Sequence, residues 1–168
     1  MRKLICKIKF EQVKYYIYLS LVVMWMILVF SFSAQVSVES DNTSSHIVDF
    51  AVIIINKTGY ILNQQHIDVI TFIVRKLAHF SLYALGGFLI VNYISVTKIK
   101  KYFLYSVIIG ISYATTDEIH QLFVEGRSCE LRDVIIDSLG ILFGCSLFYI
   151  MNRIIMKCVN KRGNLIGK

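Results

Sequence analysis

The sequence predicts an all-α, polytopic helical membrane protein with about four transmembrane helices and both termini cytoplasmic. Hydrophobic residues make up 56% of the chain, charged residues only 17%, and proline is absent, which is an apolar excess over ordinary soluble domains. The chain also has long charge-free runs, with Lys and Arg gathered on one side of them. Its 168 residues leave room for about four spanning helices but hardly for a soluble domain beside them. We therefore expect one membrane domain, 1–168.

Four segments are expected to span the bilayer. The first, about 15–36, lies in a run of 24 residues without charge, Tyr15 to Val38, and a spanning helix needs roughly 20. A basic stretch precedes this run, as in a signal peptide, but the apolar core exceeds the usual ~7–15 residues. We expect an uncleaved anchor. The other predicted spans are about 77–96, 102–124 and 134–152.

Two further segments lie outside these spans. A polar region at 37–76 is expected to form an outward loop, and its apolar stretch Val48–Ile55 is too short to cross a bilayer. That stretch is typical of an interfacial or re-entrant helix. A basic C-terminal tail, 153–168, follows the last span.

The distribution of charge predicts the orientation. The two tails and the hairpin at 98–101 hold 13 of the 18 Lys and Arg but a single acid, Glu11, whereas the other side holds 5 basic residues and 10 acids. The positive-inside rule therefore places both termini in the cytoplasm. The net charge of +7 then reflects topology, and we expect no nucleic-acid partner.

The third span ends in an unusual concentration of charge. Its uncharged part, Tyr102–Thr116, has 15 residues, which cover about 22 Å of a roughly 30 Å hydrocarbon core. We expect the helix to continue through Asp117–Val124. Asp117 and Asp137 each lie 16 residues from an inner basic residue, or about 24 Å along a helix, and His79 lies at about 28 Å. The polar groups of three helices are thus expected to meet just below the outer boundary.

Burying such groups costs a few kcal/mol each, so mutual pairing must offset the cost. Helical spacing puts Arg75, Lys76, His79 and Tyr83 on one face, Asp117, His120 and Gln121 on a second, and Asp133, Asp137, Gly140 and Gly144 on a third. Glycines suited to close helix approach lie at Gly86, Gly87, Gly110, Gly140 and Gly144.

The ordered motifs resemble the VanZ family of bacterial membrane proteins over roughly Ile17 to Tyr149. They are Phe32-Ser33-Ala34-Gln35, Arg75-Lys76-Leu77-Ala78-His79-Phe80 with Tyr83, Thr116-Asp117-Glu118-Ile119-His120-Gln121-Leu122-Phe123, Gly126-Arg127, and Asp133-Val134-Ile135-Ile136-Asp137-Ser138-Leu139-Gly140. The resemblance implies a small helical envelope protein related to low-level resistance to teicoplanin-type glycopeptides, with no settled catalytic activity. The family commonly has Pro where this chain has Glu125, which leaves the shape of that turn open.

Two hypotheses follow for the polar cluster. In the first, it binds or shields lipid-linked cell-wall precursor: arginine forks match phosphate oxygens, acids hold the cations, and the glutamines bond sugar or peptide groups. The expected ligand-binding residues are Gln35, Arg75, Lys76, His79, Asp117, Glu118, Gln121, Arg127, Asp133 and Asp137.

In the second, the protein is a membrane enzyme acting on a polyprenyl phosphate by acid/base chemistry. The catalytic candidates are His79, Asp117, Glu118 and His120. No established nucleophile motif supports this hypothesis, and enzymatic activity stays open. Mg²⁺ or Ca²⁺ held by the acids is a variant of either hypothesis. There is no zinc spacing, and we predict no metal and no cofactor.

A structural alternative stands beside both: the charges could form an interhelical ion-pair network that fixes packing and topology. A transporter or channel is disfavoured because the charges are confined to one half of the membrane. The bilayer is the predicted partner, and the oligomeric state is not predicted.

Overall fold

The computed structural model describes residues 2–35, 37–57, 59, 62–127 and 129–166. These residues form helices and no strand, which confirms the all-α prediction. The side chains of 2–9, 37–46 and 161–166 lie outside the described part, and with them several basic residues of the predicted cytoplasmic tails. The helices are α1 (Arg2–Ser33), α2 (Ser37–Asn56), α3 (Gln64–Val96), α4 (Tyr102–Gln121) and α5 (Leu131–Ile166).

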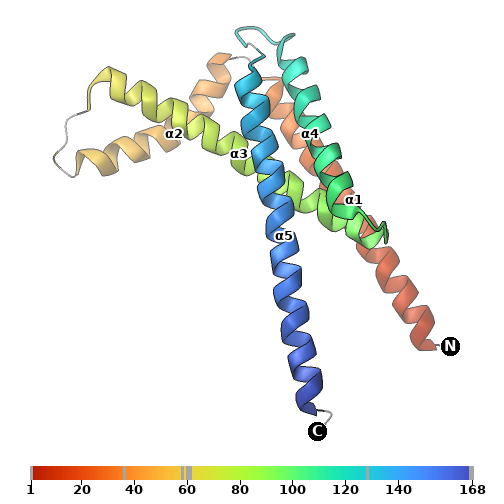
Figure 1. The fold of residues 1–168 in the computed structure, drawn as a ribbon. Helices are drawn as coiled ribbons and strands as arrows, with labels where there is room; N and C mark the ends of the chain where they lie inside the picture. Colours follow the sequence, from red (N-terminus) through yellow and green to blue (C-terminus); the bar gives the residue numbers. More distant parts are fainter. Residues whose placement is uncertain (1, 36, 58, 60–61, 128, 167–168) are drawn as a thin grey trace.

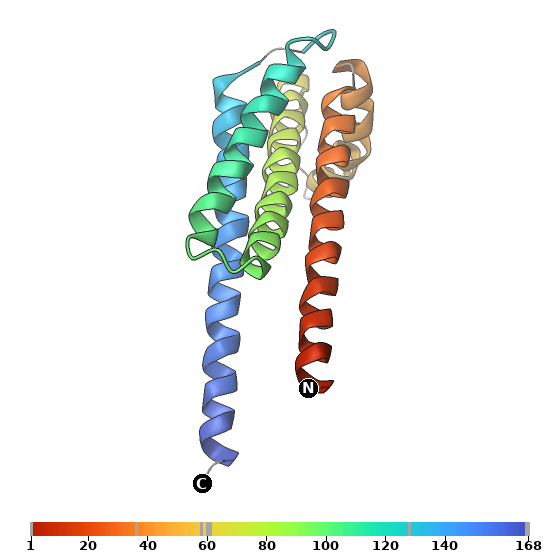
Figure 2. The same cartoon turned by 90° about the vertical axis from the view of Figure 1, so that its right-hand side faces the viewer.

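Helix α3 is the centre of the molecule, because it contacts all four other helices. Its first half runs beside α2, and the two form an arm that projects from the bundle (Figure 1). In the turned view α1, α3, α4 and α5 run alongside one another (Figure 2). The start of α1 and the end of α5 lie at the same end of the molecule in both views, as the predicted topology requires.

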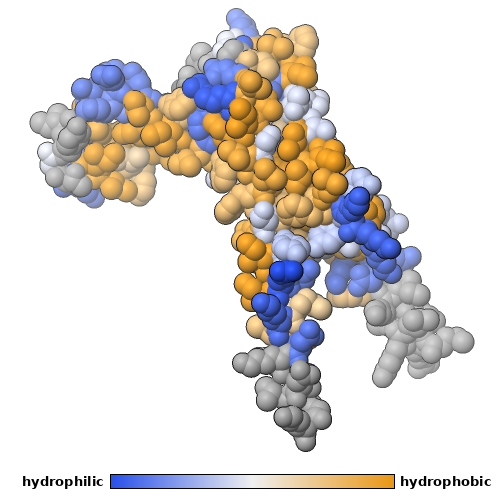
Figure 3. Space-filling model, in the orientation of Figure 1, coloured by the Kyte–Doolittle hydropathy of each residue, from blue (hydrophilic) through white to orange (hydrophobic). Residues whose placement is uncertain are grey.

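Three of the described helices are long and apolar enough to cross a bilayer. They lie at Phe10–Ser33, Gln64–Val96 and Leu131–Asn160. Apolar surface covers the middle of the bundle, and polar surface gathers toward the free ends of α1 and α5 and on parts of the opposite end (Figure 3). A lipid environment accounts for this surface, since soluble monomers rarely expose such large contiguous apolar patches.

The structure corrects three sequence-based boundaries. The predicted span at 102–124 is α4, which ends at Gln121 and is not among the three candidate spans, because its last turns are rich in polar residues. The predicted outward loop at 37–76 is mostly helical: it contains α2 and the start of α3. The predicted basic tail from 153 continues α5 to Ile166, since nothing before that residue breaks the helix.

Local signals in the sequence explain both ends of α3. Asn63 forms a capping box: its side-chain oxygen accepts from the His66 amide at 2.9 Å, and its own amide donates to His66 Nδ1 at 3.4 Å. At the other end Thr97 caps the helix through its hydroxyl, which donates to the Ile94 carbonyl at 2.7 Å. Lys98 then adopts a left-handed conformation with φ 63°, and the chain reverses into α4.

Helices α3 and α5 pack backbone to backbone through the glycines of α5. A Cβ on Gly140 would lie 2.5 Å from the Phe80 carbonyl oxygen, and one on Gly144 would lie 1.9 Å from that of Ala84. Helix α1 packs on α3 in a similar way, because the Trp25 ring occupies the space where a Gly86 Cβ would be. The predicted role of these glycines in close helix approach is confirmed.

We expect Gly144→Ala to destabilise the protein by about 2 kcal/mol or more, because the added methyl meets backbone that cannot rotate away, and overpacking costs about 1–3 kcal/mol even against movable side chains. Thermal unfolding in detergent should show a lower Tm. Leu147→Ala is the control, since Leu147 lies on the exposed side of the same helix. An unchanged Tm for Gly144→Ala would contradict the close α3–α5 packing.

Candidate functional site

Polar side chains from α3, α4 and α5 meet at one level of the bundle, as the distances along the sequence predict. His79 Nδ1 on α3 lies 3.5 Å from Asp137 Oδ1 on α5. One turn further along α3, the Tyr83 hydroxyl donates to Asp117 Oδ2 on α4 at 2.9 Å. The cluster therefore joins three helices through two neighbouring residues of α3.

Asp137 is one of the two fully buried acids of the cluster. Its side chain is 0% exposed, and neither oxygen makes a hydrogen bond among the described residues. Gly140, one turn away, brings the α5 backbone against Phe80, so the Asp137 carboxyl is held at the surface of α3. The His79 imidazole approaches it from α3.

Glu118 fastens the loop between α4 and α5. Its side chain is fully buried and accepts hydrogen bonds from Gln121 Nε2 at 3.2 Å and from the Glu130 amide at 3.3 Å. The second bond fixes the residue before α5. Glu118 thus positions the loop between α4 and α5.

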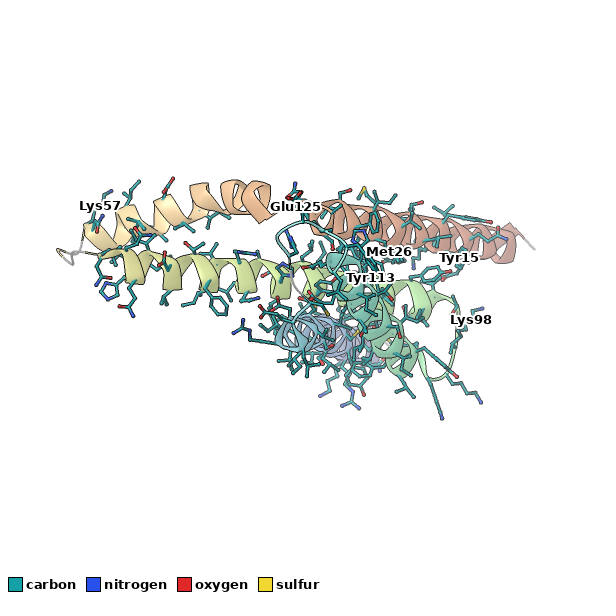
Figure 4. The ribbon with its side chains drawn as sticks, turned by 90° about the horizontal axis from the view of Figure 1, so that it is seen from above. Tyr15, Met26, Lys57, Lys98, Tyr113 and Glu125 are labelled. Carbon is teal, nitrogen blue, oxygen red and sulfur yellow. The ribbon has the colours of Figure 1, made fainter. Side chains whose placement is uncertain are left out.

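Arg127 ties the same loop to the end of α1. Its guanidinium donates to the Gln35 carbonyl at 3.1 Å, to Gln121 Oε1 at 3.3 Å and to the Phe32 carbonyl at 3.5 Å. Gly126 has φ 76°, a conformation that favours glycine, so the turn forms although Glu125 replaces the Pro common in the family. Glu125 lies in this loop close to the end of α1 (Figure 4).

A second interhelical link lies on the arm side of the site. Lys76 of α3 forms an ion pair with Asp133 of α5, and the Lys76 ammonium also lies 5.2 Å from the centre of the Phe72 ring. The guanidinium carbon of Arg132 lies 4.9 Å from the centre of the same Phe72 ring. The start of α5 is therefore anchored to α3 by charge as well as by packing.

Two cavities flank this cluster. The first, about 440 Å³, lies between α1 and α3 and has apolar walls from residues such as Val29 and Leu82 together with polar groups. The second, about 450 Å³, is lined mainly by polar and charged side chains of α3, α5 and the loop before α5. Arg75, His79 and Arg127 line both cavities. These three residues form the shared wall.

The cavities separate the predicted site residues into two groups. Those that line at least one cavity are Gln35, Arg75, Lys76, His79, Asp117, Gln121, Arg127 and Asp133. Glu118 and Asp137 line neither and lie behind the cavity walls. His120 is also outside them: its ring packs 4.4 Å from the Phe30 ring, and its buried Nδ1 has no partner among the described residues.

The expectation that all four acids hold cations is met in part. Asp133 pairs with Lys76 and Asp137 approaches His79, whereas Asp117 takes a tyrosine hydroxyl and Glu118 takes an amide side chain and a backbone N–H. Neutral donors take the place of cations for the two acids of α4: the Tyr83 hydroxyl of α3 reaches Asp117, and the Gln121 side chain of α4 and the Glu130 backbone N–H reach Glu118.

The sequence-based site omitted Ser33 and Tyr83, which also line the first cavity. Ser33 is 3% exposed, and its hydroxyl has no partner among the described residues. Tyr83 is 1% exposed. Both residues belong to the motifs that carry the family resemblance. Tyr83 follows His79 by four residues and therefore lies on the same face of the helix, which is a signal for including it in the site.

The described residues contain no group of three or more His, Cys, Asp or Glu side chains arranged to hold a metal ion. The four acids of the site come from α4 and α5, and tyrosine, glutamine and histidine side chains contact three of them. The chemistry that the site offers is therefore that of arginine, lysine and histidine facing the cavities, with carboxyl groups behind or beside them.

The fold and the polar cluster together define an all-helical membrane protein with a charged site inside its helix bundle. A family model described as VanZ/LLP1 matches residues 17–152, which is most of the chain. The protein belongs to the VanZ/LLP1 family. Comparison with curated proteins and with solved structures found no match.

We expect Arg127→Ala to loosen the end of α1. Each lost hydrogen bond to a charged donor is worth about 1.5–3 kcal/mol, so local opening should become at least about tenfold more frequent. Hydrogen exchange measured by mass spectrometry should be faster at the amides of Ala34 and Gln35, which follow the last residue of α1 and donate to the Phe30 and Phe32 carbonyls. Arg132→Ala, at an exposed arginine near the same loop, should leave these amides unchanged. Equal exchange in wild type and Arg127→Ala would show that Arg127 does not hold α1.

Proposed function

We propose that this protein is a multi-pass cell-membrane protein that contributes to tolerance of teicoplanin-type glycopeptides by binding or shielding lipid-linked cell-wall precursor. The observation that carries the proposal is the shared wall: Arg75, His79 and Arg127 stand between a cavity with apolar walls and a polar cavity. A molecule with a hydrocarbon chain and an anionic head needs both environments next to each other. Each cavity is within the range of about 300–1,000 Å³ typical of ligand pockets.

The first cavity suits the chain end of such a lipid. It lies between α1 and α3, and the Ala78 and Ser81 positions beside it are exposed on the lipid-facing surface of α3. A lipid in the outer leaflet could therefore enter from the side. Ser33 and Asp117 also line this cavity, and the Ser33 hydroxyl and Asp117 Oδ1 are buried without a partner among the described residues.

The second cavity suits the head. Arg75, Lys76, Arg127 and Arg132 all contribute to its lining, and guanidinium groups match phosphate oxygens through paired N–H donors. Gln121, also on this wall, offers an amide for sugar or peptide groups. A pyrophosphate at the shared wall would leave its sugar or peptide portion in the polar cavity and its carrier chain against α1 and α3.

We expect Arg75→Gln to weaken binding of farnesyl pyrophosphate, used as a short soluble probe, roughly tenfold to hundredfold. The reason is the loss of charge-assisted hydrogen bonds worth about 1.5–3 kcal/mol each. Binding to the purified protein in detergent can be measured by calorimetry. Arg75 is chosen because Arg127 also holds the end of α1, which would confuse the reading.

Lys57→Gln is the matched control. This substitution removes one positive charge, as Arg75→Gln does, but Lys57 lies at the tip of the α2–α3 arm (Figure 4) and lines neither cavity. If Arg75→Gln and Lys57→Gln weaken binding of farnesyl pyrophosphate equally, Arg75 acts only through general electrostatic attraction. Absence of saturable binding by wild type would overturn the proposed ligand class.

In cells, we expect wild type to raise teicoplanin tolerance of a susceptible Gram-positive host, and His79→Ala, Asp117→Asn and Arg127→Ala to lose that effect at matched membrane levels. The reason is that all three side chains line the first cavity. Growth inhibition by teicoplanin and vancomycin is the measurement. Variants that protect as well as wild type would assign the cluster a structural role, and a wild type without effect would remove the tolerance role in that host.

A further inference from the structure

The shared wall contains more than anion-binding side chains. His79 lines both cavities together with two arginines, and it contacts a carboxyl group, Asp137, that lines neither cavity. A binding site for an anionic head has no evident use for a fully buried carboxyl with both oxygens unpartnered in the described structure. Such a group adds negative charge and costs free energy to bury.

The geometry gives the two residues different roles. Nδ1 of His79 is buried and faces Asp137 Oδ1 at 3.5 Å, while the His79 side chain as a whole is 30% exposed. The rest of the side chain, which includes Nε2 at the opposite edge of the ring, accounts for this exposure. A 3.5 Å separation is long for a hydrogen bond, but such bonds are often long in unliganded enzymes and shorten when substrate binds.

Once that bond forms, its chemistry is determined. A carboxylate that accepts from Nδ1–H keeps the proton on Nδ1 and leaves the Nε2 lone pair free to take a proton. The carboxylate also stabilises the imidazolium that results. Close packing of Gly140 and Gly144 on α3 prevents Asp137 from moving away, so the orientation is built into the backbone.

We propose that the site hydrolyses a lipid-linked pyrophosphate, with His79 as the general base and Asp137 as its positioning residue. The inference rests on the proposed binding function and adds turnover to it. Water from the outer surface attacks the terminal phosphorus, and His79 Nε2 takes a proton from that water. The new O–P bond replaces the bond between the terminal phosphorus and the bridging oxygen. For a lipid whose terminal phosphate bears no sugar, the products are inorganic phosphate and the lipid monophosphate, and the proton passes from His79 to solvent.

Arg75 and Arg127 have a defined part in this step. Both line the same wall as His79, and negative charge moves onto the bridging oxygen as its bond to the terminal phosphorus breaks. Guanidinium groups fixed near that oxygen stabilise the charge as it develops. The monophosphate leaves as an anion, so no separate acid is needed to protonate it.

The test is release of inorganic phosphate from farnesyl pyrophosphate by the purified protein in detergent. We expect turnover by wild type, a loss of at least about 100-fold in kcat for His79→Ala, and a loss of at least about tenfold in kcat for Asp137→Asn with KM unchanged. Asp137→Glu should recover part of the rate. A merely structural role for Asp137 would change KM and kcat together and would not distinguish the two Asp137 variants.

Binding of the methylene-bridged analogue, which cannot be hydrolysed at the bridge, is measured in parallel. Wild-type binding of the analogue without phosphate release would overturn the hydrolysis and leave the proposed function standing. Absence of binding would overturn both. Full turnover by His79→Ala would also overturn the inference. Thr115→Ala, on the exposed side of α4, is the control for folding and should match wild type in both measurements.

Discussion

The close approach of α3 and α5 is the constraint on which the rest of the structure depends. Gly140 and Gly144 let the α5 backbone lie directly on the carbonyls of α3. That contact brings Asp137 against His79 and, at the start of α5, Asp133 against Lys76. A larger residue at either glycine would push α5 away from α3. The polar side chains of the two helices would then lose their contacts with each other. Small residues in α5 thus determine the electrostatics of α3.

A second constraint comes from the end of α1 and the loop before α5. Arg127 reaches back to the carbonyls that end α1, and Glu118 holds the backbone of the same loop. Further along α1, the Trp25 indole N–H donates to the Leu82 carbonyl of α3 at 2.9 Å, and the Tyr93 hydroxyl of α3 donates to the Tyr15 hydroxyl of α1 at 3.0 Å. Tyr113 adds a bond from α4 to the Met26 carbonyl of α1 at 2.7 Å (Figure 4). The helix is therefore held at several points, with space between them at the level of Ser33.

The sequence was informative where the chain has a strict period or a fixed rise. The separations from the inner basic residues, 16 residues for Asp117 and Asp137 and 19 for His79, predicted that these side chains meet, and the glycine pattern predicted the packing that joins them. Helix limits were less predictable. The segment 37–76 looks like a loop because Ser, Asn and Asp are frequent, yet α2 forms because its apolar end can pack on α3. The composition of this segment indicates a polar surface. Its packing on α3 explains why it is helical.

The sequence does not predict which partner each of the four acids has in the structure. Asp117, Glu118, Asp133 and Asp137 look equivalent as residue types in a membrane, and each would be expected to seek a cation. In the structure a tyrosine, an amide with a backbone N–H, a lysine and a histidine serve as the respective partners. The partner of each acid depends on which donor group lies close enough to contact its carboxyl oxygens. Because α3 supplies Lys76, His79 and Tyr83 at successive turns, the three acids they contact take a cation, an imidazole and a hydroxyl in that order. The chemistry of the site thus follows from the order of residues along α3, while α4 and α5 supply carboxyl groups of one kind.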